Sequence, residues 1–166
     1  MNIHSRVLEE NDFNEMKALL LRDGPNEWNF LTEASIQHQF NLIKEGKAEA
    51  ILAEDERIIG FAVLIFGEFC PKKIQKYTKL ESVAYINDVI VSKNHSGQGI
   101  GRNLLLGCVS MAKIRKFKEV YIERHEENLA SAGMMAKAGF NVVETFFDPK
   151  KRFFGSKNTS MLKKCT

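Results

Sequence analysis

The stretch Val89–Leu105, "VIVSKNHSGQGIGRNLL", decides the fold because a glycine-rich loop joins two kinds of periodicity there. A β-branched apolar run ends at Val91, three glycines follow at Gly97, Gly99 and Gly101, and helical apolar spacing begins directly afterwards. A strand that turns into a helix in this way leaves the N–H groups of the turn and of the first helical turn pointing at one spot. Glycine reaches positive φ without strain and offers no Cβ to keep a bulky anion away. The stretch therefore predicts a phosphate-binding turn.

Two familiar phosphate-binding motifs do not fit these glycines. A P-loop requires Gly-Lys followed by Ser or Thr, but Gly101 is followed by Arg102. A dinucleotide fingerprint that starts at Gly97 would need its third glycine at Arg102, and no acidic residue follows at the required distance. Neither nucleotide hydrolysis nor dinucleotide binding is supported.

The periodicity along the rest of the chain switches repeatedly between about two and about 3.6 residues, which is typical of a mixed sheet flanked by helices. Strands are expected at Met1–Val7, Ala48–Ala53, Ile58–Phe66, Ser82–Val91, Glu119–Arg124, Phe140–Phe147 and Phe153–Leu162. Helices are expected from Glu9 to just before Gly24, and at Thr32–Lys44, Gly99–Lys116 and Asn128–Ala138. We therefore expect one domain, residues 1–166, of the α/β (mixed α+β) class, with a mostly antiparallel mixed sheet of about seven strands and about four helices.

Composition excludes several classes of protein. Cys70, Cys108 and Cys165 are few and widely separated, so neither a disulfide framework nor a thiolate zinc site is supported and a cytoplasmic location is expected. The net charge is +3 with both signs interspersed, which argues against nucleic-acid binding. The longest apolar run, Ile58–Gly67, is too short to span a bilayer, and the N-terminus lacks a signal-peptide core, so we expect no membrane association.

Two separated stretches together resemble the Gcn5-related N-acetyltransferase (GNAT) family. Val89–Leu105 is similar to the family's acetyl-CoA signature, and "NLASAGMMAKAGF", Asn128–Phe140, is similar to its second signature. The residues "YINDVIV", Tyr85–Val91, are nearest to the diamine acetyltransferase-like branch. The resemblance implies a GNAT fold that uses acetyl-CoA and no metal to acetylate a primary amine. Many relatives form homodimers, so a homodimer is a further expectation.

The resemblance also implies which positions hold the cofactor. The main chain of residues 89–91 would pair with the pantetheine arm, the loop would hold the diphosphate, and Asn128 would bind the pantetheine or simply cap its helix. Ser96 departs from the signature, which has Gln or Arg there, and His95 or Arg102 could compensate. The implied cofactor-binding residues are Val89, Ile90, Val91, Gly97, Gln98, Gly99, Ile100, Gly101, Arg102, Asn128 and Ser131.

The proton-handling residues of the family are the main departure. Asn87 stands where the named branch has a glutamate, and Met135 stands where a tyrosine commonly protonates the leaving thiolate. An alkyl amine has a pKa of about 10.4, so some group must take its proton at neutral pH. The candidate catalytic residues are Tyr85, Asn87, Glu81 and His125, with Asp88 and Glu123 also close in sequence, but neither Asn87 nor Met135 can itself move a proton. Strand alternation places Tyr85 and Asn87 on one face and Asp88 on the other, which favours Tyr85.

The acceptor and two other functions stay open. Glu27, Trp28 and Glu68 could favour a cationic or aromatic small-molecule or peptide amine, although Trp28 could equally pin its loop to the core. A non-catalytic CoA-binding module is the alternative function, motivated by Asn87 and Met135. A third possible function is that of a mixed-sheet interaction domain that binds no cofactor.

Overall fold

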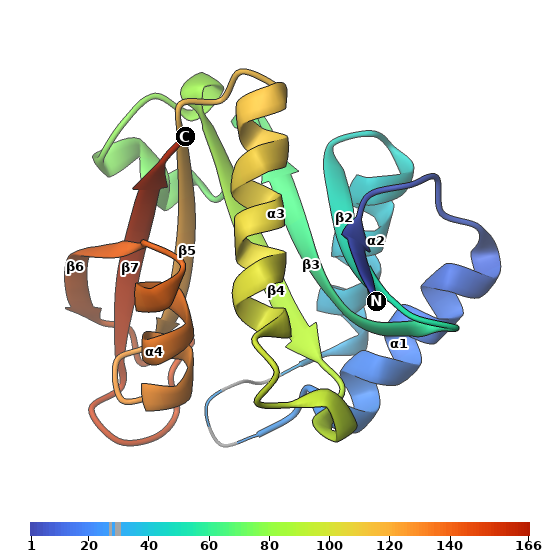
Figure 1. The fold of residues 1–166 in the computed structure, drawn as a ribbon. Coiled ribbons are helices and arrows are strands. Elements are labelled where there is room, and N and C mark those ends of the chain that lie inside the picture. Colours follow the sequence, from blue (N-terminus) through green and yellow to red (C-terminus); the bar gives the residue numbers. More distant parts are fainter. Residues whose placement is uncertain (27, 29–30) are drawn as a thin grey trace.

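Seven strands form one twisted sheet in the order β1-β2-β3-β4-β5-β7-β6 (Figure 1). The computed structural model describes residues 1–26, 28 and 31–166. The strands are β1 (Asn2–His4), β2 (Ala48–Glu54), β3 (Ile58–Phe66), β4 (Val83–Val91), β5 (Glu119–His125), β6 (Asn141–Phe147) and β7 (Asn158–Cys165). The helices are α1 (Glu10–Asp23), α2 (Glu33–Lys44), α3 (Ile100–Ile114) and α4 (Leu129–Lys137). Only β4 and β5 pair in parallel, so the predicted fold class is confirmed.

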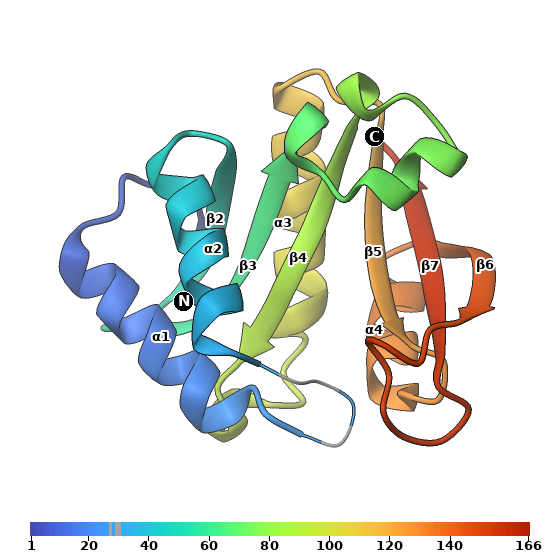
Figure 2. The same ribbon diagram turned by 180° about the vertical axis from the view of Figure 1, so that it is seen from behind.

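The helices cover both faces of the sheet. α3 and α4 lie on the face towards the viewer in Figure 1, and α1 and α2 lie on the opposite face, seen in Figure 2. Each face has its own apolar core, with Phe61 and Val63 facing α1 and α2, and Ala62 and Leu64 facing α3 and α4. Every residue of β3 is buried because both of its faces are covered.

The sheet opens at the middle of β4. This strand pairs with β5 only over Val83–Ile86, opposite Glu119–Ile122. Beyond that point β4 stays paired with β3, and β5 stays paired with β7. The two strands therefore diverge, as Figure 1 shows, and the inner main-chain groups at the end of β4 face the opening.

A β-bulge at Asn87 corrects the predicted alternation of β4. Val63 pairs with Asp88 while Leu64 pairs with Ile86, so Asn87 is an extra residue in the ladder. The insertion puts Asp88 on the same face as Tyr85, where strict alternation predicted the opposite face. Side chains of both Asn87 and Asp88 contact Gln39 of α2, which lies on that face.

The last predicted strand also begins later than expected. The Asp148 N–H donates to the Lys157 carbonyl, and Gly155 and Lys157 adopt positive φ, so the chain turns here instead of extending from Phe153. β7 starts at Asn158 and continues into the final residues. This turn, residues 148–157, becomes part of the candidate site below.

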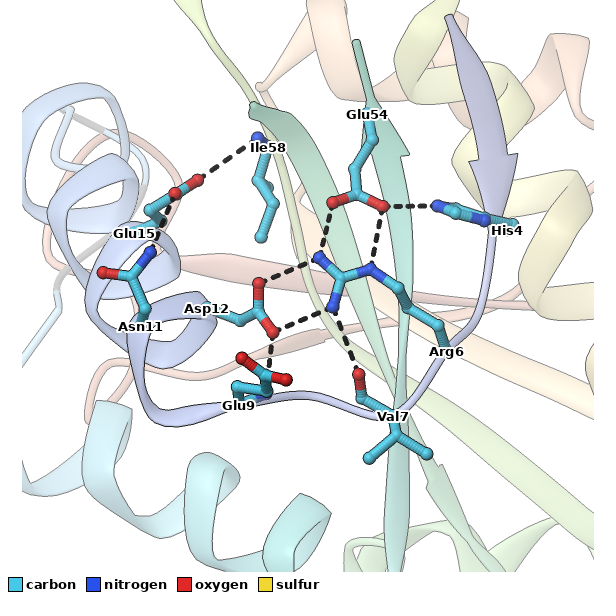
Figure 3. A network of polar contacts seen from close by, with 9 residues as sticks. All are labelled: His4, Arg6, Val7, Glu9, Asn11, Asp12, Glu15, Glu54 and Ile58. Carbon is cyan, nitrogen blue, oxygen red and sulfur yellow. Dashed lines mark hydrogen bonds and ion pairs between the residues drawn. The ribbon is translucent and has the colours of Figure 1, made fainter. Parts of the chain in front are cut away.

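An arginine ties the N-terminal segment to the first helix and to β2 (Figure 3). Arg6 donates to both carboxylate oxygens of Asp12 at 2.8 Å and also to Glu54. Asp12 in turn accepts from the Glu9 N–H at 2.7 Å and so caps α1. The hydrogen bonds from Arg6 lower the pKa of both carboxyl groups. In the described part of the chain, no helix has the length and apolarity that crossing a membrane requires.

Candidate functional site

A cleft of about 1210 Å³ lies where β4 and β5 diverge. One wall is the end of β4, another is the start of α4, and the floor is the glycine loop with the start of α3. The connection between α1 and α2 contributes Asn26 and Trp28 to the remaining side. The opening of the sheet, the glycine loop and the two helix N-termini therefore meet in one cavity.

The glycine loop has the geometry expected of an anion site. Gly97 has φ of +77° and Gly99 has φ of +78°, and a Cβ built on either glycine would meet nothing within 4 Å. Gly99 is the N-cap of α3, and no side chain caps this end among the described residues. The first N–H groups of α3 are therefore left for an external acceptor. Gly101 differs, because a Cβ there would lie 2.6 Å from the sulfur of Met134 on α4.

Basic side chains surround this loop. Lys93, His95, Arg102 and Lys137 all line the cleft. The Nδ1 atom of His95 is buried and has no hydrogen-bond partner within the described residues. Positive charge and unused donors at the end of a helix favour a ligand that carries phosphate groups. Lys93 and Lys137 were not predicted from the sequence, because a lone lysine has no motif.

The structure brings together nearly all of the predicted cofactor-binding residues. Gln98 is exposed and does not line the cleft, whereas the other ten do so. Asn128 is buried and caps α4, since its Oδ1 accepts from the Ser131 N–H at 3.2 Å. Capping fixes the amide of Asn128 at the cleft wall, so its two predicted roles are compatible.

The predicted residue Tyr85 lies deep in the sheet and is bound to Glu123. Its hydroxyl donates to Glu123 Oε1 at 2.7 Å, and Lys73 Nζ lies 2.6 Å from the same oxygen. Burial and the neighbouring carboxylate raise the pKa of Tyr85 well above its ordinary value, so the phenol stays protonated at neutral pH. Burial opposes ionisation of Glu123, but the ammonium groups of Lys151 and Lys73 outweigh it and lower its pKa. The pair is thus a neutral donor held against a carboxylate.

Asp88 is an ionisable group that the bulge moves to the same face as Tyr85, opposite to the face expected from alternation. It lines the cleft, and its Oδ2 accepts from Gln39 Nε2 at 2.9 Å. Burial raises its pKa to about 6, although Gln39 and Lys151 act in the opposite direction. Asn87 donates to Gln39 Oε1 at 2.9 Å, so it helps to fix the orientation of this amide. A carboxylate whose pKa lies near neutrality suits general base catalysis.

His125 is held by main-chain contacts. Its Nδ1 accepts from the Glu127 N–H at 3.0 Å, so Nε2 carries the proton and donates to the Phe154 carbonyl at 2.7 Å. The Trp28 ring packs on the imidazole with centroids 4.8 Å apart. Both ring nitrogens are therefore occupied, and the geometry supports a structural role for His125. Trp28 both packs on His125 and lines the cleft, so neither of its two predicted roles is excluded.

Two other predicted residues, Glu68 and Glu81, do not line the cleft. Glu68 and Glu81 line a separate depression near the start of β4, whereas the glycine loop follows the end of that strand, roughly 25 Å away at about 3.3 Å per residue. Glu27 lies outside the described residues. Met135 is 4% exposed in the core beneath α4, whereas its neighbour Met134 lines the cleft.

Metal ligands and reactive thiols are not found at this site. The described residues contain no group of three or more His, Cys, Asp or Glu side chains placed to hold a metal ion. Burial raises the pKa of the Cys70 thiol to about 12, and Cys108 is fully buried. The arrangement therefore favours direct attack on a bound substrate over a cysteine intermediate.

Comparison with known proteins identifies the family. Residues 13–140 match the Acetyltransferase (GNAT) family, which is more than half of the chain. The chain belongs to the GNAT family. A curated relative, the chloroplastic GCN5-related N-acetyltransferase 6 of Arabidopsis thaliana, is 34% identical over 61 residues, which cover 37% of this chain. The match spans 21% of that relative's length.

Solved structures of this GNAT fold cover the chain almost completely. A ribosomal-protein-alanine N-acetyltransferase from Brucella melitensis has a TM-score of 0.75 at 21% identity, with 100% of each chain covered. A Bacillus subtilis acetyltransferase in complex with CoA has a TM-score of 0.71 at 15% identity, with 99% of each chain covered. An aminoglycoside acetyltransferase in complex with coenzyme A and kanamycin has a TM-score of 0.76 at 18% identity, with 99% of this chain and 95% of that chain covered. The finer assignment to the diamine acetyltransferase-like branch stays a prediction.

Proposed function

We propose that this GNAT protein is an acetyl-CoA-dependent N-acetyltransferase that acts on a primary amine by direct attack in a ternary complex. One observation carries the proposal: the glycine loop, the free N-terminus of α3 and the diverging edge of β4 line a single cleft of about 1210 Å³. Small-molecule pockets typically measure about 300–1,000 Å³, so this cleft is large enough for a cofactor. The CoA-bound structures of the same fold support the choice of cofactor.

The chain's own residues divide the binding of acetyl-CoA between them. The N–H groups of the loop and of the first turn of α3, with Arg102 and His95 beside them, would hold the diphosphate. The inner main-chain edge of β4 at Val89–Val91 would pair with the pantetheine as an added strand would. This arrangement would direct the thioester towards the point where β4 and β5 separate.

The reaction joins the amine to the acetyl carbon. The amine is a cation at neutral pH, so it must first give up one proton to become the nucleophile. Asp88 would take that first proton, because it lines the cleft and burial raises its pKa to about 6. The nitrogen then attacks the thioester carbonyl, the C–S bond breaks, and a second proton passes from the nitrogen to the sulfur, so that CoA leaves as the thiol. A positioned base of this kind contributes about 10²- to 10⁴-fold to the rate.

The proposal is tested at Gly99. Replacing Gly99 with alanine forces an ordinary residue into positive φ and puts a methyl group over the loop, although no described atom lies within 4 Å of it. We expect the dissociation constant for CoA, measured by calorimetry, to rise about tenfold or more. Gly46→Ala is the matched control, since Gly46 has φ of +73°, equally open surroundings and no place in the cleft.

Two results bear on the alternatives. Unchanged CoA affinity in a folded Gly99→Ala protein would overturn the proposed cofactor site. Tight CoA binding with no release of free CoA in the presence of any polyamine, amino acid, aminoglycoside or peptide amine would favour the non-catalytic module. Asp88 favours the enzyme, because it lines the cleft and burial raises the pKa of its carboxyl group to about 6.

A further inference from the structure

A mixed-charge cluster lies on the α2 face of the sheet, beside Tyr85 and close to the point at which β4 and β5 separate. Glu123 has a side chain only 2% exposed, and its Oε1 accepts from Tyr85. Two ammonium groups share that same oxygen, Lys73 at 2.6 Å and Lys151 at 3.4 Å. Lys73 comes from the 3-10 segment Lys72–Lys76 and Lys151 from the turn before β7, so two separate segments converge on one carboxylate.

The other carboxylate oxygen of Glu123 is unused. Its Oε2 is buried and has no hydrogen-bond partner among the residues that the structure describes. A buried carboxylate oxygen without a partner costs free energy, so its presence calls for a ligand that donates to it. An acceptor amine, protonated as it arrives, is such a donor.

Two ammonium groups share the single carboxylate of Glu123 as their ion-pair partner. Arg152 is balanced through Thr159, whose hydroxyl accepts from Arg152 Nε at 2.8 Å and donates to Asp148 at 2.7 Å. Lys73 and Lys151 are left with Glu123 as their shared partner. The one other acid that acts on Lys151 from the cleft side is Asp88, and it becomes neutral when it holds a proton.

Both lysines can also reach a ligand from solvent. Their side chains are 37% and 47% exposed, respectively. Desolvation lowers the pKa of Lys151, the attraction of Glu123 opposes this change, and repulsion from Lys73 and Arg152 adds to it. An anion that accepts from both ammonium groups on their exposed side would use donors that Glu123 leaves free.

We propose that the acceptor is an amine that also carries an anionic group, a carboxylate or a phosphate, with its amine on Glu123 and its anion between Lys73 and Lys151. The inference rests on the proposed acetyltransferase function and narrows its substrate class. It differs from the sequence-based expectation of a cationic or aromatic acceptor, which rested on Glu27, Trp28 and Glu68. Glu68 lies near the start of β4, away from the cleft, and Glu27 lies outside the described residues.

The test compares amines in matched pairs by the release of free CoA. Amino acids and short peptides are compared with their C-terminal amides, and a phosphorylated amine with its dephosphorylated form, with a polyamine and an aminoglycoside as cationic probes. We expect kcat/KM to be roughly tenfold or more higher for the anionic member of the preferred pair. The pair with the larger ratio of kcat/KM between its two members shows whether the site prefers a carboxylate or a phosphate on the acceptor.

Variants of the exposed lysines connect that preference to the site. Lys73→Met and Lys151→Met should each remove most of the preference through KM, whereas Lys150→Met, an exposed neighbour of Lys151, should leave it unchanged. Equal or better turnover of the uncharged or polycationic amines by the natural protein would overturn the inference while leaving the acetyltransferase function intact. Absence of turnover on every amine despite CoA binding would instead overturn the proposed function, and the inference with it.

Discussion

At the scale of single residues, burial decides which acid can take a proton. Asp88 has one neutral donor, Gln39, and its pKa lies at about 6. Glu123 has two ammonium partners, which hold its pKa below the ordinary value. Two carboxyl groups on one face of the sheet are thus driven in opposite directions, which separates a proton acceptor from a permanently charged binding group.

Replacement of Asp88 by asparagine tests the proton acceptor. The variant should lose about 10²- to 10⁴-fold in kcat while keeping its affinity for CoA, because the amide cannot take the proton. Charging Asp88 costs stability as pH rises from its unfolded pKa through about 6, so the variant should denature at an equal or higher urea concentration at pH 8. Activity within threefold of the natural protein would exclude Asp88 as the base.

The pH dependence of the natural protein gives a second test at this residue. The carboxylate form exists above its pKa, so kcat/KM should fall as pH drops through about 6. Gln39→Leu removes the hydrogen bond that lowers the pKa of Asp88, so the acidic limb should move to higher pH. A purely structural role for Gln39 would reduce activity without moving the limb, and a rate profile recorded from pH 5 to pH 9 distinguishes these results.

At the scale of elements, the Arg6 contacts make α1 and β2 sensitive to acid (Figure 3). The pKa values of Asp12 and Glu54 are lowered mainly by their hydrogen bonds to Arg6. Groups with depressed pKa values contribute stability that is fully present above their ordinary values near 4 and is lost as pH falls below them. The contribution should therefore be constant around neutrality.

Replacement of Arg6 by methionine is expected to lower the free energy of unfolding by about 1 kcal/mol at pH 7. The difference from the natural protein should shrink as urea denaturation is repeated at pH values falling below about 4, because the unfolded chain then binds protons that Arg6 keeps off Asp12 and Glu54 in the folded protein. Lys17→Met is the control, since its ion pair with Glu33 is exposed and should contribute less than about 0.5 kcal/mol. A loss that is equally large at both pH values would contradict the electrostatic origin.

Elements with strong local signals were predictable from the sequence. The bounds of β3, Ile58–Phe66, follow from an unbroken apolar run, and Thr32 was recognised as the cap of α2 from its hydroxyl. The bulge at Asn87 could not be predicted, because a bulge depends on the register with β3 and does not change the pattern of apolar residues. That single insertion places Asp88 on the same face as Tyr85. Strand alternation therefore no longer favours Tyr85 over Asp88.

Residues of the site that lie in turns were also missed. Lys73 and Lys151 are 78 positions apart and meet only because a 3-10 segment and the turn before β7 both approach Glu123. The glycine loop could be predicted because contiguous residues build it and main-chain groups do the binding. Sites assembled from distant side chains need the tertiary structure.

At the scale of the whole molecule, two parts of the sheet meet along a short seam. The strands β1–β4 and the strands β5–β7 share only the four parallel pairs from Val83–Glu119 to Ile86–Ile122, with α3 and α4 packed across one face (Figures 1 and 2). The proposed position of the pantetheine lies in the continuation of this seam. A ligand there contacts β4 on one side and α4 on the other, so it should hold the two parts together.

Hydrogen–deuterium exchange tests this bridging role. At a CoA concentration of about 100 times its dissociation constant, the folded state should gain about 2.7 kcal/mol. The added protection should centre on two groups of amides. Residues 89–91 have no partner strand on the β5 side, and residues 97–102 form the glycine loop and the start of α3, where no side chain caps the helix in the described part of the chain. For Gly99→Ala, a tenfold higher dissociation constant should reduce this stabilisation to about 1.4 kcal/mol at the same CoA concentration, whereas Gly46→Ala should retain it in full. A ligand that pairs with the edge of β4 must shield the amides there from exchange. Protection that spreads evenly over the sheet and spares residues 89–91 would therefore show that CoA does not bind along this edge.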